Sequence, residues 1–170
     1  MALNKTVEKK LNEQINAELW SAYLYLSMSN YLSDQGMSGF ASWMRVQYDE
    51  ETFHAMKLID YINERNGRVL LNPIGAVPAE WDGVLNVFEE TLKHEEEITQ
   101  LINECVDVAI DVRDHATTNF LQWYVNEQVE EEASASELLD QLKLVGNSGN
   151  GLFVLDKEAG ARVFTPPATV

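Results

Sequence analysis

Four long segments of the chain carry apolar residues at helical spacing, and the connections between them differ sharply in length. The segments span about 4–34, 38–67, 82–111 and 115–145. The first and third connections need only a few residues, whereas the connection at 68–81 has fourteen. Fully extended, it could span roughly 46 Å at ~3.3 Å per residue, the length of a helix of about 27 residues rising ~1.5 Å each. The second and third helices can therefore lie parallel.

Short, long and short connections between four helices are typical of a four-helix bundle with one crossover. Ser38 is expected to cap the second helix, and Gly146 is expected to end the fourth. A short fifth helix is expected at 152–159. We therefore predict an all-α chain with one domain at 1–160 and an irregular C-terminal tail at 161–170.

The charge balance excludes some classes of partner. With 28 acidic and 12 basic residues the formal net charge is −16, which repels nucleic-acid phosphates and makes metal cations the more natural partners. A merely soluble acidic protein explains this charge equally well, and composition alone does not choose between the two. The longest uncharged stretch, 19–33, is interrupted by serines and is too short for a membrane span. A lone cysteine, Cys105, and an N-terminus without a hydrophobic signal region favour a cytoplasmic localisation.

Each long helix also places an acidic residue on the face that it is expected to bury. Glu18 is an example, because it lies three residues after Ile15 and four before Ala22 on the apolar stripe. The corresponding polar residues of the other helices are Glu51 with His54, Glu95, and Glu131 with Glu127 and Gln128. An unpaired ionised carboxylate in a core costs several kcal/mol, on the order of the stability of a whole domain. The helices contain too few inward lysines or arginines, so a bound cation is the expected compensation.

The types of these side chains indicate which cation. Carboxylate oxygens with a single imidazole suit iron or manganese and argue against structural zinc, which prefers sulfur and nitrogen. Di-iron carboxylate bundles take one Glu from each of two helices and a Glu-x-x-His motif from each of the other two. The matching residues are Glu18 and Glu95, the motif Glu51-x-x-His54, and an altered second motif, Gln128-x-x-Glu131. The sequence therefore predicts a di-iron site.

The order of these motifs resembles bacterial non-haem ferritins over nearly the whole chain. The stretches that carry the resemblance are Leu11-Asn12-Glu13-Gln14 with Glu18, Glu50-Glu51-x-x-His54, Lys93-His94-Glu95, Asn119-Phe120-Leu121-Gln122-Trp123-Tyr124, Glu127-Gln128-Val129-Glu130-Glu131, and the ending at 151–158. Bacterioferritins carry a histidine where this chain has Glu131, and DNA-protecting miniferritins usually lack the fifth helix. The resemblance thus implies a ferritin-like four-helix bundle of the bacterial non-haem type.

The resemblance also implies a set of iron ligands. The first iron would be held by Glu18, Glu51 and His54, with Glu51 bridging to a second iron held by Glu95 and Glu131. Gln128 would be a hydrogen-bonding neighbour of the site. A third iron would use Glu50, Glu127, Glu130 and a shared oxygen of Glu131. Tyr25 has two open interpretations, an electron donor beside the iron pair or a core residue with a satisfied hydroxyl.

The function implied by the resemblance is iron storage. Such a protein is a ferroxidase that oxidises Fe(II) to Fe(III) with dioxygen or peroxide and stores ferric mineral in a homo-oligomeric cage of 24 subunits. An alternative is a di-iron oxidase or peroxidase acting on reactive oxygen species or an organic substrate, since it can use the same ligands. The acids Glu50, Glu127 and Glu130 and the fifth helix favour storage. His94 is interpreted as a packing residue, and His115 could lie on an acidic entry route.

Overall fold

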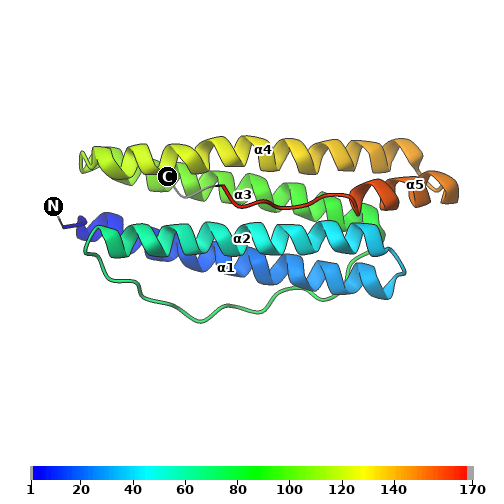
Figure 1. The fold of residues 1–170 in the computed structure, drawn as a ribbon, viewed down its shortest axis with the longest axis horizontal. Helices are drawn as coiled ribbons and strands as arrows, with labels where there is room; N and C mark the ends of the chain where they lie inside the picture. Colours follow the sequence, from blue (N-terminus) through cyan, green and yellow to red (C-terminus); the bar gives the residue numbers. More distant parts are fainter. Residues whose placement is uncertain (1, 168–170) are drawn as a thin grey trace.

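The computed structural model describes residues 2–167, which form five α-helices and no strand. The helices are α1 (Lys5–Asp34), α2 (Ser38–Glu64), α3 (Gly83–Asp111), α4 (His115–Val145) and α5 (Gly149–Ala159). Figure 1 shows α1 to α4 side by side, with α2 and α3 running in the same direction and α5 at the far end from the N-terminus. The predicted all-α bundle with one crossover and a fifth helix is therefore confirmed.

The predicted cap of α2 is wrong, and the difference shows how α5 is attached. Ser38 is the first residue of the helix, and the capping position, Met37, makes no side-chain hydrogen bond. Instead, Asp156 Oδ1 on α5 accepts hydrogen bonds from the backbone N–H groups of Gly39 and Phe40, both at 2.9 Å. A Cβ atom at position 39 would lie 1.5 Å from the Asp156 carbonyl oxygen, so only glycine permits this approach. The start of α2 is thus capped by another helix.

Other helix ends differ from the prediction by about three residues. The second helix ends at Glu64 instead of continuing to residue 67. The fifth begins at Gly149 instead of residue 152, because the Ser148 side chain accepts a hydrogen bond from Gly151 N and caps it. By contrast, the fourth helix ends where it was predicted to end, at Val145 with Gly146 as its C-cap. The φ of Gly146 is 53°, which glycine adopts without strain.

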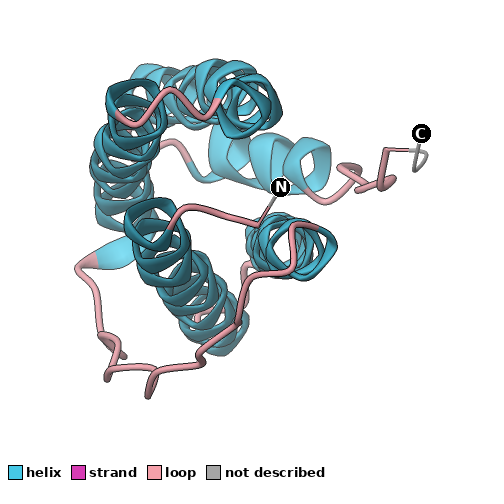
Figure 2. Ribbon diagram, turned by 90° about the vertical axis from the view of Figure 1, so that its left-hand side faces the viewer, coloured by secondary structure: helices cyan, strands magenta, loops and turns pink. Residues whose placement is uncertain are grey.

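The crossover between α2 and α3 is fixed to the outside of the bundle by α1 (Figure 2). Five α1 side chains donate hydrogen bonds to its backbone carbonyl oxygens: Asn12 to Arg68 at 3.0 Å, Asn16 to Asn72 and Pro73 at 3.3 Å, Trp20 to Ala76 at 3.2 Å, Ser27 to Pro78 at 2.7 Å and Tyr31 to Trp81 at 2.8 Å. These residues are spaced along α1. The extended segment therefore follows the helix for most of its length.

The apolar core consists of two clusters, one towards each end of the bundle. One contains Tyr25, Met28, Phe40, Phe88 and Leu139, and the other contains Leu11, Ile15, Leu58, Ile102 and Leu121. On every long helix, the polar residues predicted for the site lie between the stretches that feed the two clusters. Leu85 on α3 and Val129 on α4 are apolar but 40% and 70% exposed in the single chain. No helix within residues 2–167 is long and apolar enough to cross a membrane.

Candidate metal centre

A layer of buried polar side chains separates the two apolar clusters. All four long helices contribute to it: Glu18 from α1, Glu51 and His54 from α2, Glu95 from α3, and Gln128 and Glu131 from α4. Each of them is at most 4% exposed. The prediction that carboxylates point into the core is therefore confirmed for every helix of the bundle.

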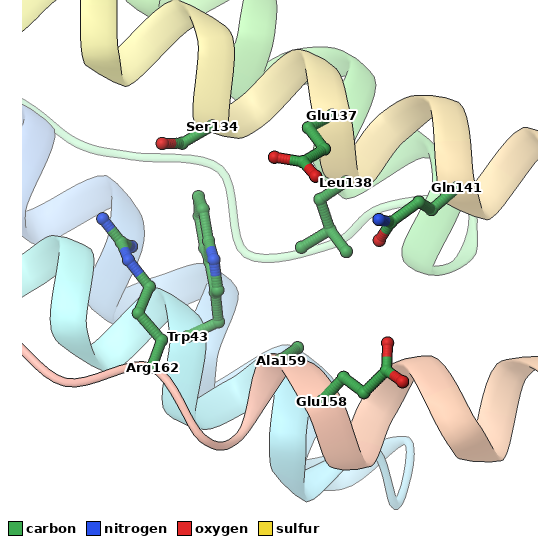
Figure 3. Close-up of a pocket in the computed structure, with 8 residues that line it drawn as sticks. All are labelled: Trp43, Ser134, Glu137, Leu138, Gln141, Glu158, Ala159 and Arg162. Atoms are coloured by element: carbon green, nitrogen blue, oxygen red, sulfur yellow. The ribbon is translucent and has the colours of Figure 1, made fainter.

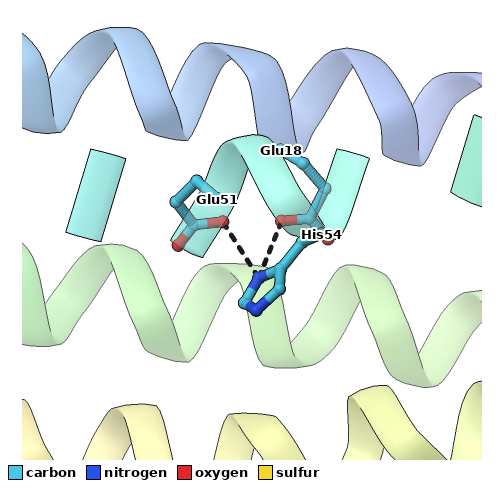
Figure 4. A group of neighbouring side chains, drawn as sticks. All are labelled: Glu18, Glu51 and His54. Carbon is cyan, nitrogen blue, oxygen red and sulfur yellow. Dashed lines mark ion pairs between the residues drawn. The ribbon is translucent and has the colours of Figure 1, made fainter. Parts of the chain in front are cut away.

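Glu18, Glu51 and His54 form the tightest group in this layer. One ligand atom of each lies within 4.8 Å of the others. His54 Nδ1 is 3.4 Å from Glu51 Oε2 and 4.0 Å from Glu18 Oε2, and Figure 4 shows the two carboxylates turned towards the ring. Gln14, one turn before Glu18 on α1, donates to Glu18 Oε1 at 2.9 Å. Within residues 2–167, Glu51 Oε2 is buried without a hydrogen-bond partner.

The other nitrogen of His54 faces a second group of acids. His54 Nε2 lies 4.0 Å from Glu127 Oε1, and His54, Glu127 and Glu131 form another set of possible ligand atoms within 4.8 Å of one another. This nitrogen, too, is buried and has no hydrogen-bond partner in the described part of the chain. A single imidazole therefore lies between carboxylates on both sides.

Neutral donors hold the two remaining carboxylates of the layer. Glu95 accepts hydrogen bonds from the Tyr25 hydroxyl and from Gln128 Nε2, the latter at 3.2 Å. Glu131 Oε2 accepts from Gln47 Nε2 at 3.0 Å. These donors orient the acids without neutralising them. The Tyr25 hydroxyl is thus satisfied by an acid of the site, which agrees with both interpretations of this residue.

The acids predicted for a third iron lie at different depths. Glu50 is half-buried and pairs with Arg162, whose Nη2 is 2.5 Å from Glu50 Oε2. Glu127 is half-buried and belongs to the second group of possible ligand atoms. Glu50 belongs to neither group, and neither does Glu130, which is exposed. We expected too few inward lysines or arginines in the four long helices to pair with these acids. Arg162 nevertheless pairs with Glu50, because it comes from the segment beyond α5 and not from the bundle helices.

Burial shifts the protonation of the whole layer. Burial, followed by the negative charge of Glu95, raises the pKa of Glu131 to about 8. Burial raises the pKa of Glu95 to about 7, although the hydrogen bonds from Tyr25 and Gln128 act to lower it. The pKa of Glu51 rises well above its usual value through burial and the neighbouring carboxylates. Burial, assisted by Lys57, lowers the pKa of His54 to about 4, so its ring is neutral at pH 7. Without a metal, the site holds protons.

This set of donors fits a hard cation. Two of its buried polar atoms, Glu51 Oε2 and His54 Nε2, lack a partner among the described residues, and a neutral imidazole offers a lone pair. A divalent cation would replace several protons and remove the repulsion between the carboxylates. The arrangement can therefore bind metal ions through oxygen ligands supplied by four helices.

The structure adds residues that the sequence patterns did not assign. Gln14 and Gln47 each lie four residues before a site acid on the same helix face, and this spacing is the signal that could have indicated them. Arg162 gives no such signal, because it lies outside any helix. His94 is buried and satisfied, since its Nε2 lies 2.7 Å from Ser21 Oγ and its ring packs against Trp20.

Known proteins are similar to this chain over nearly its whole length. A family model described as the ferritin-like domain matches residues 8–145. The bacterial non-heme ferritin of Bacteroides fragilis (strain 638R) is 42% identical over 94% of this chain and 99% of its own. That of Campylobacter jejuni is 43% identical over 91% and 93%. The solved structure of an Archaeoglobus fulgidus ferritin engineered into a closed form superimposes with a TM-score of 0.95 at 49% identity, covering 96% of this chain and 100% of the other.

Proposed function

The chain belongs to the bacterial non-haem ferritin family, and from this membership we propose that it oxidises ferrous iron and stores the ferric product. The observation that carries the proposal is the layer of carboxylates and one neutral imidazole buried across the middle of the bundle. Iron is the substrate and the stored cargo. This is also the function that the sequence predicts: ferroxidase activity together with iron storage.

We assign the two ferroxidase irons to the acids of this layer. Glu18, Glu51 and His54 would hold the first, and their ligand atoms already lie within 4.8 Å of one another. Glu95 and Glu131 would hold the second, with Glu51 as the bridge. Support for a bridging role comes from Glu51 Oε2, which is buried and has no hydrogen-bond partner among residues 2–167.

In this proposal, the protein contributes orientation, charge and proton release. Gln14, Gln47 and Gln128 hold carboxylate oxygens by hydrogen bonds, so the ligands are arranged before iron arrives. The acids, which carry protons at neutral pH, release them as ferrous ions bind. Hard anionic oxygens stabilise Fe(III) over Fe(II), which favours transfer of an electron from each iron to dioxygen or peroxide. Tyr25 remains a candidate electron donor through its hydrogen bond to Glu95.

A third iron is assigned to Glu50, Glu127 and Glu130, with an oxygen shared by Glu131. Support comes from the second group of ligand atoms, in which Glu127 and Glu131 lie beside the free nitrogen of His54. Glu130 is exposed and would have to turn inwards to join them. This site would receive iron next to the ferroxidase pair.

The protein is expected to act as a homo-oligomer, and we propose a cage of 24 subunits. The apolar side chains of Phe153 and Val154 on α5 are 63% and 52% exposed in the single chain, which suits burial between subunits. We also propose one domain at 1–160 with a tail at 161–170, and a cytoplasmic localisation, which the buried free thiol of Cys105 supports.

The ferroxidase assignment can be tested by rapid kinetics. Glu18→Ala and His54→Ala should each abolish fast ferrous oxidation, measured by stopped-flow absorbance, because each removes a ligand from the proposed first iron. Glu96→Ala is the matched control, since Glu96 is the exposed neighbour of Glu95 on α3. Circular dichroism should show folded helices in all variants. Parent-like oxidation rates in both site variants would refute the assignment.

The storage function needs a separate test, because a di-iron oxidase could share the ligands. Electron microscopy of the full-length protein should show a hollow shell. Deleting the chain from Gly149 onward should weaken this shell without unfolding the four long helices, since α5 packs mainly against α2 at one end of the bundle. A stable monomer of the full-length protein in sedimentation would contradict storage in a cage.

A further inference from the structure

Arg162 is a cation that the chain itself brings to the acids of the proposed third site. It lies just after α5, in the segment that runs back along the bundle in Figure 1. Its Nη2 donates to Glu50 Oε2 at 2.5 Å, and the two side chains are only 22% and 13% exposed. Glu50 directly precedes Glu51 on α2. One of the acids assigned to iron is therefore already occupied by a guanidinium group.

Aromatic contacts fix the segment around Arg162 in this position. The Arg162 guanidinium carbon lies 4.4 Å from the centre of the Trp43 ring, a cation–π contact. Two residues later, the ring of Phe164 packs edge-on against Phe53 with centroids 5.7 Å apart. Phe53 in turn contacts His54. The segment thus covers the layer of acids from the side of α2.

The Arg162 contact is incomplete. Its Nη1 is buried and has no hydrogen-bond partner within residues 2–167, which costs free energy. Among the acids of the proposed third site, Arg162 reaches only Glu50, through N–H donors in one plane, whereas a small divalent cation binds several carboxylate oxygens directly from several directions. Arg162 is therefore a weaker occupant of Glu50 than a metal ion held by two or three acids.

An open pocket beside Arg162 offers its guanidinium group a second location. About 350 Å³ of space lies between α4 and α5, with Arg162 and Trp43 at one end and the acids Glu137 and Glu158 towards the other. Figure 3 shows Glu137 on α4 and Glu158 on α5 facing this space. A guanidinium group placed in this space would meet these carboxylates.

We propose that Arg162 is a built-in counter-cation which a metal ion must displace from Glu50, so that filling the third site moves Arg162 into the cavity between α4 and α5. The inference rests on the proposed function, because it takes Glu50 as a metal ligand. Arg162 would be a positioning residue that keeps the third site closed while metal is absent. Binding of the third ion and movement of the C-terminal segment would be coupled.

Calorimetry with Zn²⁺ tests the competition without oxidation chemistry. Titrating the metal-free, full-length protein should show a weak class of sites whose affinity rises about tenfold in Arg162→Gln, equivalent to about 1.4 kcal/mol, because a charge-assisted hydrogen bond no longer competes. Arg162→Lys keeps the charge and should restore most of the parent behaviour. Arg45→Gln is the matched control, since Arg45 also carries one positive charge on the surface of this region but lies over Tyr48. Equal affinities in the parent and Arg162→Gln would overturn the proposal.

Crystals of the parent soaked in Zn²⁺ test the displacement directly. We expect Zn²⁺ on Glu50 and the Arg162 side chain away from it, within the cavity. Zn²⁺ on Glu50 with Arg162 still hydrogen-bonded there would overturn the inference, as would the absence of Zn²⁺ from Glu50 in both the parent and Arg162→Gln. The ions at Glu18, Glu51 and His54 report separately on the ferroxidase assignment. An empty first site would refute that assignment, whereas a filled one with an unmoved Arg162 would refute only this inference.

Discussion

Replacing Glu131 by glutamine should stabilise the metal-free protein at pH 8 and leave its stability at pH 5 nearly unchanged. Glu131 is 4% exposed, and its pKa is raised to about 8 by burial and by the charge of Glu95. Glutamine has almost the same shape. Its carbonyl oxygen can accept the hydrogen bond that Gln47 donates to Glu131 at 3.0 Å. The substitution therefore removes the charge and keeps the packing.

The size of the effect follows from the difference in pKa between folded and unfolded chains. A carboxyl group with a pKa of 4.5 when unfolded and about 8 when folded binds its proton more tightly in the folded state. Its contribution to stability is fully present below pH 4.5 and is lost as the pH rises to about 8. At 1.36 kcal/mol per pH unit the complete loss is roughly 4–5 kcal/mol. Since neighbouring carboxyls share protons, we expect roughly 2–5 kcal/mol.

Thermal unfolding between pH 5 and pH 8.5, followed by circular dichroism in the presence of a chelator, measures this effect. The Tm of Glu131→Gln should exceed that of the parent by roughly 4–20 °C at pH 8, given ~2–4 °C per kcal/mol for a chain of this size. Glu130→Gln is the matched control, because Glu130 is the adjacent, exposed residue on α4. Parallel curves for the parent and Glu131→Gln would refute the reasoning that a buried charge destabilises the empty site.

Three further predictions concern protons, assembly and the third site. Anaerobic addition of Fe²⁺ or Zn²⁺ in weak buffer should release more protons at pH 6 than at pH 9. The reason is that Glu95 and Glu131, with pKa values of about 7 and 8, carry protons at pH 6 and must lose them to bind metal. Equal proton release at both pH values would contradict this. Gly39→Ala should push α5 off α2, because the new alanine Cβ would lie 1.5 Å from the Asp156 carbonyl oxygen. Sedimentation should then show a weaker assembly. Ser38→Ala is the control and should have little effect, since Ser38 does not cap α2. Glu130→Ala should keep oxidation of the first two irons per subunit fast while changing the iron consumed per oxygen and the recovery of the centre; unaltered multi-turnover kinetics would exclude Glu130.

Helical periodicity was sufficient to predict most of the fold. It depends on residues a few positions apart, whose relation within a helix is set by 3.6 residues per turn. The same rule placed Glu18, Glu51, Glu95 and Glu131 on buried faces, and all four are buried. The failures were local. Leu85 and Val129 are apolar residues of α3 and α4 that are exposed in the single chain.

Contacts between distant segments could not be predicted in this way. Asp156 caps α2 from 116 residues away, and no local pattern distinguishes this aspartate from the neighbouring acids. Arg162 pairs with Glu50 across 112 residues and lies in a segment without periodicity. Such pairs depend on how α5 and the segment after it pack against α2, which contacts between distant side chains determine.

The amino-acid sequence by itself determined the helices, the length of the crossover and the four acids that face the core, because each depends on short-range spacing and on the length of extended chain. Only the tertiary structure decided that His54 lies between two groups of carboxylates, that Gln47 holds Glu131, and that Arg162 occupies Glu50. The physical reason is that distances of 3–4 Å between side chains of different helices depend on how the helices pack against each other, which local spacing does not specify.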